Sequence, residues 1–186
     1  GCPIVSIDAP MYPVDLVYDP PEREGDTESM LEKIVEVSGR IIRRGAPGDI
    51  LVFLPGELMI KECVLRLREL DREDKLEILP LYARLSHEEQ SRVFDEFPGK
   101  RKVIVSTNIT ETSVTIDGVM WVLDSGLAKI NSYNPRTFTE SLVETPVSKA
   151  SCNQRRGRAG RTAPGTCYRL YSRKDYESRP MYTVEE

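Results

Sequence analysis

The chain has 186 residues, of which 39% are hydrophobic and 30% are charged, and its net charge at pH 7 is −4. This balance is typical of one globular domain and excludes a disordered tail, which has too few apolar residues to build a core. No run approaches the ~18 to 20 apolar residues of a membrane-spanning helix and no secretion signal is visible, so we expect an intracellular protein, nuclear or cytoplasmic.

Apolar runs bounded by Gly, Pro and Asp recur along the chain at intervals that leave room for helices, which is typical of alternating strands and helices. The strands are expected at 14–18, 49–54, 76–81, 102–106, 120–124 and 166–171. Several are apolar at consecutive positions, as strands covered on both faces of a parallel sheet are. The predicted fold class is α/β: a doubly wound, mainly parallel sheet with helices on both faces and ligands beyond the carboxyl ends of its strands.

Three helices are expected, one in each interval between the first four predicted strands. The first begins near Thr27 and ends before Gly45, with apolar residues at helical spacing. The second follows Gly56 and carries one apolar stripe. The third begins with the capping box 86–89 and is expected to run to about Phe97.

Segments 127–133 and 137–144 are rich in β-branched and aromatic residues, and Asn134-Pro135-Arg136 lies between them as a turn. This pattern predicts a β-hairpin over about 127–144 that projects from the sheet. No repeat or low-complexity linker divides the chain, so we expect a single domain over residues 1–186.

The four cysteines are scattered singly at positions 2, 63, 152 and 167, and His87 is the only histidine. This argues against structural zinc and against a disulfide framework, so no metal site is predicted. His87 falls in the first turn of the third helix, where we expect it to be exposed rather than a ligand.

The net charge conceals an asymmetry. Residues 145–174 include eight basic residues and no acidic one, so the rest of the chain carries −12. A basic stripe on an acidic body is a candidate anion site, although a solvated helix face has the same composition.

The strongest local signal within that stretch is the segment 154–161. On a helix, Arg158 and Arg161 share a face with Gln154, so two guanidinium groups and a carboxamide are expected to point the same way. Glycine at 157 and 160 costs helix stability, which makes sense if another backbone or a ligand approaches closely. Planar guanidinium donors suit the negative charge of a phosphoryl group in transfer, whereas the alternative is an arginine-rich surface helix.

A second signal is the polar segment 106–118, which directly follows a buried strand. Its hydroxyls and amides can donate to phosphate or sugar, or the segment can be a set of turns that caps a short helix. The sequence has no Gly-x-x-x-x-Gly-Lys-Ser/Thr loop and no acidic pair placed to hold magnesium. We therefore expect the arginines to complete a site whose phosphate loop lies elsewhere.

Together these segments resemble the second RecA-like domain of the DEAH-box helicases, which are superfamily 2 RNA-dependent ATPases. The similar segments follow the same order over nearly the whole chain: 51–56 (motif IV), 80–82, 106–118 (motif V), 124–136, 154–161 (motif VI) and 162–171. A DEAD-box relative would have His at position 154, and viral helicases of the superfamily are less similar in motif V and the hairpin.

The resemblance implies roles in ATP hydrolysis. Arg158 and Arg161 correspond to arginine fingers that reach the β- and γ-phosphates, and Gln154 to a residue that contacts the γ-phosphate or the attacking water. The nucleotide-binding positions implied are Phe94 (adenine stacking), Ser113 (γ-phosphate sensing), and Thr115 and Asp117 (ribose).

On the RNA side, the resemblance assigns backbone contacts to Gly56, Thr107 and Asn108, and a wedge at one end of the bound strand to the hairpin. Such contacts read the backbone rather than the bases, so sequence specificity should be low. The implied partners are RNA, the first RecA-like lobe of the same protein and a glycine-rich-patch activator protein. The implied cofactor is ATP with Mg²⁺, the metal being held mainly by the first lobe.

The sequence departs from the family at three positions. Pro55 and Glu57 stand where the family usually has Thr and Gln, which removes a hydroxyl and adds a carboxylate near the RNA. Arg156 replaces a small residue in motif VI.

The leading hypothesis is the C-terminal motor lobe of an ATP-dependent RNA helicase, with the isolated lobe inactive and weak in ATP binding. The eight basic residues of 145–174 would divide between fingers for ATP and a lining beside RNA. The alternatives are a helicase-derived module that binds RNA or protein without turnover, and an unrelated flavodoxin-like nucleotide-binding regulator, which would leave the arginine pair unexplained.

Overall fold

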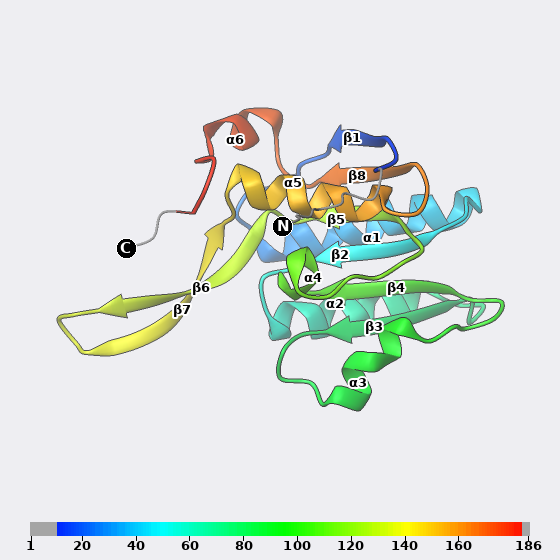
Figure 1. Cartoon of the computed structure of the whole chain (residues 1–186), viewed down its shortest axis with the longest axis horizontal. Coiled ribbons are helices and arrows are strands. Elements are labelled where there is room, and N and C mark those ends of the chain that lie inside the picture. The colour runs from blue at the N-terminus through cyan, green and yellow to red at the C-terminus, as the bar shows by residue number, and fades with distance from the viewer. Residues whose placement is uncertain (1–10, 184–186) are drawn as a thin grey trace, which may run out of the picture.

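A computed structural model of the chain describes residues 11–183. Its centre is a sheet of six strands, all parallel, in the order β1-β8-β5-β2-β4-β3 (Figure 1). The strands are β1 (Val14–Tyr18), β2 (Asp49–Phe53), β3 (Leu76–Leu81), β4 (Arg101–Ser106), β5 (Val119–Asp124) and β8 (Gly165–Arg169). Each predicted strand is present within two residues of its expected ends, and the α/β fold class is confirmed.

Two long helices cover one face of the sheet (Figure 1). Helix α1 (Thr27–Arg44) begins at Asp26, whose side chain accepts a hydrogen bond from the Ser29 N–H, and ends at the left-handed Gly45. Helix α2 (Glu57–Leu70) follows Gly56 and buries one stripe against the sheet. The larger hydrophobic core forms here, from α1, α2 and one side of the central strands.

The opposite face carries shorter elements: α3 (His87–Ser91), the 3₁₀ turn η1 (Arg92–Phe94), α4 (Ile109–Thr112), α5 (Lys149–Gly157) and the 3₁₀ turn η2 (Arg158–Gly160). The Ser86 N-cap of α3 is confirmed, since the Glu89 N–H donates to Ser86 Oγ at 3.2 Å, whereas the Glu89 carboxylate accepts from the Ser86 hydroxyl at 3.0 Å rather than from its backbone N–H. His87 is exposed, as expected. The expected helix to Phe97 is wrong. The chain tightens into η1 at Arg92 and so buries Val93 beneath this face.

The predicted motif VI helix is also shorter than expected. Helix α5 ends at Gly157, and Arg158 begins η2, so the two arginines are not on one continuous α-helix. Glycine weakens the helix at this point. Gly160 has a further reason: a Cβ there would lie 2.6 Å from the carbonyl oxygen of Tyr12, so the expectation of a close backbone approach is confirmed at this position.

The hairpin consists of β6 (Leu127–Asn134) and β7 (Thr139–Pro146), paired antiparallel, and it projects away from the central sheet (Figure 1). The side chain of Asn134 accepts a hydrogen bond from the Arg136 N–H, as a turn-initiating Asn does. The hairpin is two residues longer at its C-terminal end than predicted. One further helix, α6 (Arg173–Ser178), follows β8. Among residues 11–183, no helix is both long and apolar enough to cross a bilayer.

Candidate functional site

The parallel sheet brings the carboxyl ends of all six central strands to one edge, where polar loops follow. Motif V follows β4 and the hairpin follows β5. One region lies on the face of the sheet that carries α5 and extends toward the amino ends of β5 and β8, and a second lies at this edge. We call them the arginine face, formed by Arg158, Arg161, Asp117 and their neighbours, and the carboxyl-edge groove, lined in part by Gly56, Thr107, Asn108 and Lys129.

Arg158 lies half-buried at the start of η2. Its Nη2 donates to the main-chain oxygen of Glu111 at 2.7 Å, while its Nε is buried without a hydrogen-bond partner among the described residues. Burial and the neighbouring guanidinium of Arg161 lower the pKa of Arg158. Two crowded cations and one unpartnered donor would be relieved by an anion, which is what a phosphate group supplies.

Arg161 is exposed, and its Nε donates to Asp117 Oδ1 at 2.9 Å. Asp117 is a predicted ribose-side residue, so motifs V and VI meet here through side chains. Neither partner is buried, with 44% of the Arg161 side chain and 75% of the Asp117 side chain accessible. The pair can therefore open at little cost when a ligand arrives.

The other predicted nucleotide residues lie on the same face of the sheet. Ser113 is exposed at the C-terminal end of α4, and Thr115 is half-buried. Phe94 is 58% exposed at the end of η1. The buried neighbours of the three segments, Val93, Ile116 and Ala159, belong to one apolar cluster, which places η1, motif V and η2 on the same face.

Gln154 is exposed on α5, and no hydrogen bond joins it to Arg158 or Arg161. The structure thus brings Arg158, Arg161 and Asp117 together but leaves Gln154 and Phe94 separate from them. The expectation that the carboxamide shares one α-helical face with both guanidinium groups is not met, because α5 ends between them.

Behind the arginine face lies a buried ion-pair network centred on Arg155, which is completely buried. Its Nε donates to Glu111 Oε1 and its Nη1 to Asp124 Oδ1, both at 2.8 Å, and its Nη2 to the Leu127 carbonyl at 3.2 Å. Burial acts to lower the pKa of Arg155, but the carboxylates of Asp124 and Glu111 raise it overall. Asp124 Oδ2 also accepts from the hydroxyl of Tyr171 at 3.0 Å.

This network corrects one expectation about the basic stretch 145–174. Arg155 and Arg169 are 0% and 1% exposed, so they belong to neither a finger set nor an RNA-facing lining. Arg169 instead donates to the Tyr18 hydroxyl and to Asn153, and it stacks on the ring of Tyr176. The partners of the two buried arginines come from other elements: α4, β5 and β6 for Arg155, and β1 and α5 for Arg169.

The carboxyl-edge groove, of about 430 Å³, lies where β2, β3 and β4 end beside the hairpin. The predicted RNA-contact residues Gly56, Thr107 and Asn108 all line it. Lys129 of β6 lies directly over Gly56, because a Cβ at that position would be 3.0 Å from Lys129 Nζ. Glycine at 56 therefore makes room for an ammonium group at the N-terminus of α2, where the helix end itself favours negative charge.

The unusual Glu57 lines the same groove. Its Oε1 lies 3.3 Å from Nη1 of Arg84, an arginine on the opposite wall, and its Oε2 lies 3.9 Å from Nζ of Lys61. Pro55 is buried at the end of β2. The added carboxylate is thus partly neutralised by Arg84 within the groove and by Lys61 one turn along α2.

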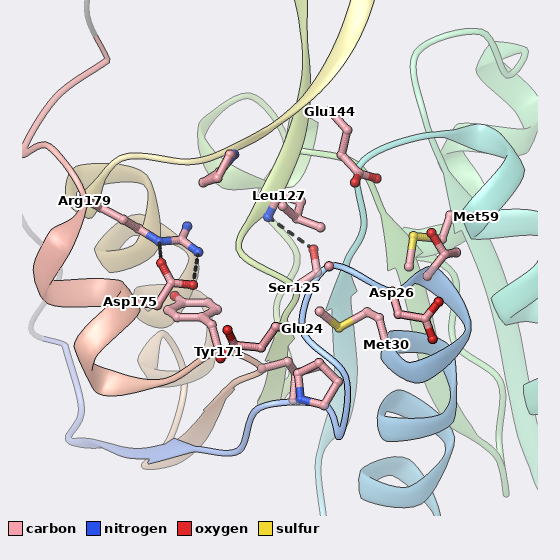
Figure 2. A pocket seen from close by; sticks show the side chains of 15 residues that line it. Glu24, Asp26, Met30, Met59, Ser125, Leu127, Glu144, Tyr171, Asp175 and Arg179 are labelled. Carbon is pink, nitrogen blue, oxygen red and sulfur yellow. Dashed lines mark hydrogen bonds and ion pairs between the residues drawn. The ribbon is translucent and has the colours of Figure 1, made fainter.

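A separate pocket of about 270 Å³ lies near the root of the hairpin (Figure 2). Met30 and Met59 lie on one side, and Tyr171, Asp175 and Arg179 on the other. Its carboxylates are Glu24, Asp26, Glu144 and Asp175. An apolar floor with an acidic rim is unsuited to a phosphate backbone.

Within residues 11–183, no group of three potential metal-ligating side chains is clustered. Cys63, Cys152 and Cys167 are free and buried, and burial raises the pKa of the Cys63 thiol to about 12. Cys2 lies outside the described residues.

Sequence reasoning missed four residues of these regions: Arg155, Asp124, Lys129 and Arg84. One signal was available for Asp124, because an aspartate that ends a run of buried apolar residues needs a buried partner. Arg155 has no comparable signal, because Arg156 and Arg158 are arginines as well and nothing in the sequence distinguishes the buried one from its neighbours.

The fold defines the class of protein. Two crystal structures of Escherichia coli HrpB, described as a DExH-box NTPase and a DEAH/RHA helicase, superpose with TM-scores of 0.81 and 0.83 at 31% and 30% identity. They cover 94% and 95% of this chain, which spans 21% and 22% of theirs. The chain is thus an α/β lobe of the RecA-like type.

The family follows from the sequence. The helicase conserved C-terminal domain matches residues 18–163, and the chain therefore belongs to that family. It is 48% identical to the ATP-dependent RNA helicase HrpA of Borreliella burgdorferi, 42% identical to HrpA of Escherichia coli and 39% identical to the probable ATP-dependent RNA helicase DHX35 of Homo sapiens. The predicted resemblance to the second RecA-like domain of DEAH-box helicases is confirmed.

Each of these matches covers the whole chain, but the chain spans only 23%, 14% and 27% of the three relatives. The activities of the relatives as whole proteins therefore also depend on segments that lie outside the part matched by this chain.

Proposed function

We propose that this chain is the C-terminal motor lobe of an ATP-dependent RNA helicase and works as part of a longer, intracellular protein. The observation that carries the proposal is the arginine face, where the half-buried Arg158 lies beside Arg161 with its Nε buried and without a hydrogen-bond partner among the described residues, and where burial and the Arg161 charge both lower its pKa. Such crowding of like charge is costly unless an anion binds. The relatives named as ATP-dependent RNA helicases support ATP as the source of that anion.

ATP bound by a first RecA-like lobe would supply the phosphoryl group, with Mg²⁺ held mainly by that lobe. Arg158 and Arg161 would donate to the phosphate oxygens, and Gln154 would contact the γ-phosphate or orient water. Ser113 would sense the γ-phosphate, Thr115 and Asp117 would lie beside the ribose, and Phe94 would stack on the base. The unpartnered Nε of Arg158 fits this role, because it is a donor already held in place.

RNA would lie along the carboxyl-edge groove, gripped through its backbone by Gly56, Thr107 and Asn108, with the hairpin as a wedge at one end. Lys129 and Arg84 add positive charge to this surface. A glycine-rich-patch protein remains part of the proposal as an activator, by family resemblance alone. The alternative, a module without turnover, rested on Pro55 and Glu57, and the pairing of Glu57 with Arg84 weakens that argument.

The test uses the full-length parent protein with Arg158→Ala and Arg161→Ala. Arginine fingers typically contribute about 10³-fold or more to phosphoryl transfer, so each variant should lose ATP turnover by that order. Both side chains lie at the surface or half-buried, so the melting temperature should stay close to that of the wild type. The matched control is Arg156→Ala, a neighbour in the same motif whose side chain forms no hydrogen bond or ion pair with the arginine face among residues 11–183.

Steady-state ATP hydrolysis with saturating single-stranded RNA is the measurement. Turnover retained by both finger variants would contradict the proposal, and so would loss of turnover in the Arg156 control. The isolated chain provides a second arm, because it lacks a phosphate loop and should bind ATP weakly and hydrolyse none.

A further inference from the structure

The buried network of Arg155, Asp124 and Glu111 touches both functional regions, although the proposed roles above use none of its members. Arg155 donates to two chain segments that are far from it in sequence: motif V at Glu111, and the stretch 124–127 where β5 ends and the hairpin begins. A planar guanidinium with several fixed donors can hold such segments in one arrangement.

On the nucleotide side, the link passes through Glu111. Its side chain accepts from Arg155 Nε at 2.8 Å, and its main-chain oxygen accepts from Arg158 Nη2 at 2.7 Å. Glu111 is thus hydrogen-bonded both to the buried Arg155 and to the proposed arginine finger Arg158. Arg155 and Arg158 are also three residues apart at the end of α5, so the two guanidinium groups share one short backbone segment.

On the RNA side, the link passes through the root of the hairpin. Arg155 Nη2 donates to the carbonyl of Leu127, the first residue of β6. Asp124 Oδ1 accepts from both Arg155 Nη1 at 2.8 Å and the Gly126 N–H at 2.7 Å. Lys129, which lies over Gly56 in the groove, is two residues further along the same strand.

The root is held from outside as well. Arg179 Nη1 donates to the carbonyls of Gly126 at 2.7 Å and Val147 at 3.0 Å, which are the entry and exit of the hairpin. Figure 2 shows Asp175 pairing with Arg179 beside Tyr171, whose hydroxyl donates to Asp124. The root of the hairpin is therefore bonded to both the α5 side and the C-terminal segment, and it is not free to hinge alone.

We propose that Arg155 is a positioning residue that couples engagement of RNA by the hairpin to placement of the finger Arg158. The inference rests on the proposed function. A displacement of the hairpin root moves Leu127 and Asp124, and the buried guanidinium transmits it to Glu111 and so to Arg158. The link excludes water, because Arg155 is completely buried, and its hydrogen bonds are not exchanged for solvent contacts.

The experiment measures ATP turnover of the full-length parent without RNA, with saturating single-stranded RNA, and at intermediate RNA concentrations. The variant Arg155→Lys keeps the charge but cannot reach three acceptors at once. We expect the ratio of RNA-saturated to basal turnover to fall about fivefold or more, as loss of coupling between two sites does. The RNA concentration for half-maximal stimulation should change much less, since the groove residues remain.

A second variant keeps the inference testable if Arg155→Lys does not fold. Glu111→Gln retains a side-chain acceptor for Arg155 but removes one of its two carboxylates, and its side chain is 12% exposed. We expect a smaller fall in the same ratio. The control for general destabilisation is Leu67→Ala, a completely buried residue of α2 on the other face of the sheet. It should lower basal and stimulated turnover in proportion.

An unchanged stimulation ratio in every folded variant of Arg155 and Glu111 overturns the inference, and so does an equal fall in Leu67→Ala. In both cases a wild-type parent with normal RNA stimulation leaves the proposed function standing. A wild-type parent without RNA-stimulated turnover overturns the proposed function and this inference together.

Discussion

Arg158 in the arginine face and Arg84 in the carboxyl-edge groove each contact a glutamate, through its main-chain oxygen in the first case and its carboxylate in the second, and the two contacts are supported differently. Arg158 rests on Glu111, which the completely buried Arg155 holds in turn. In the groove, Arg84 pairs with Glu57 at the protein surface, where 83% of the Arg84 side chain is accessible. Arg158 is thus held from behind by buried charge, whereas Arg84 is held only by an ion pair at the surface.

The difference matches the demands of the two proposed tasks. Charge that develops in a phosphoryl-transfer transition state is best met by donors whose positions are already fixed. A nucleic-acid backbone offers repeated phosphates and can be held by long, adaptable side chains without base readout. Rigidity is therefore expected behind the arginine face and not in the groove.

The largest expected effect is on stability. Asp124→Asn removes a completely buried carboxylate from Arg155 and should lower the free energy of unfolding of the chain by about 3 kcal/mol, because a buried charge is left undercompensated. Glu57→Gln, which breaks the exposed pair in the groove, should change it by less than about 1 kcal/mol. Urea denaturation of both variants is the measurement, and equal losses would contradict the comparison.

Most of the fold was predictable from the sequence because it depends on local patterns. Strands β1 and β3 begin and end at the expected residues, since apolar runs bounded by turn residues mark buried strands. The motif VI helix was harder. Its periodicity continues to Arg161, but the glycines at 157 and 160 and the approach of Tyr12 end the α-helix before that residue.

The candidate site was predictable only in part. Gly56, Thr107 and Asn108 of the groove were found through motifs that lie at strand ends, whereas Lys129 and Arg84 were not. The partners of Arg155 were not, because Glu111 and Asp124 are 44 and 31 residues away in sequence and no pattern along the chain relates them. Composition also could not show that Arg155 and Arg169 are buried while Arg161 is exposed.

The second prediction concerns Lys129 and RNA in the parent protein. Because its ammonium lies at the N-terminus of α2, Lys129→Ala should weaken binding of single-stranded RNAs of different sequence to the same extent. The slope of log affinity against log salt should fall by about 0.7, the value for one phosphate contact on a single strand. Fluorescence anisotropy at several salt concentrations measures both quantities. Lys75→Ala, at the opposite end of the sheet, is the control, and an unchanged slope for Lys129→Ala would remove this residue from the RNA surface.

The smallest expected effect is a gain. Glu57 is a carboxylate inside a groove proposed to hold phosphates, and its pairing occupies Arg84. Glu57→Gln removes the repulsion and releases the guanidinium, so RNA affinity of the parent should rise about two- to fivefold, the worth of one exposed ion pair. The gain should shrink as salt is raised, because screening weakens both contributions. Glu69→Gln, near the far end of the same helix, should leave affinity unchanged, and weaker binding by Glu57→Gln would show that RNA does not approach this wall of the groove.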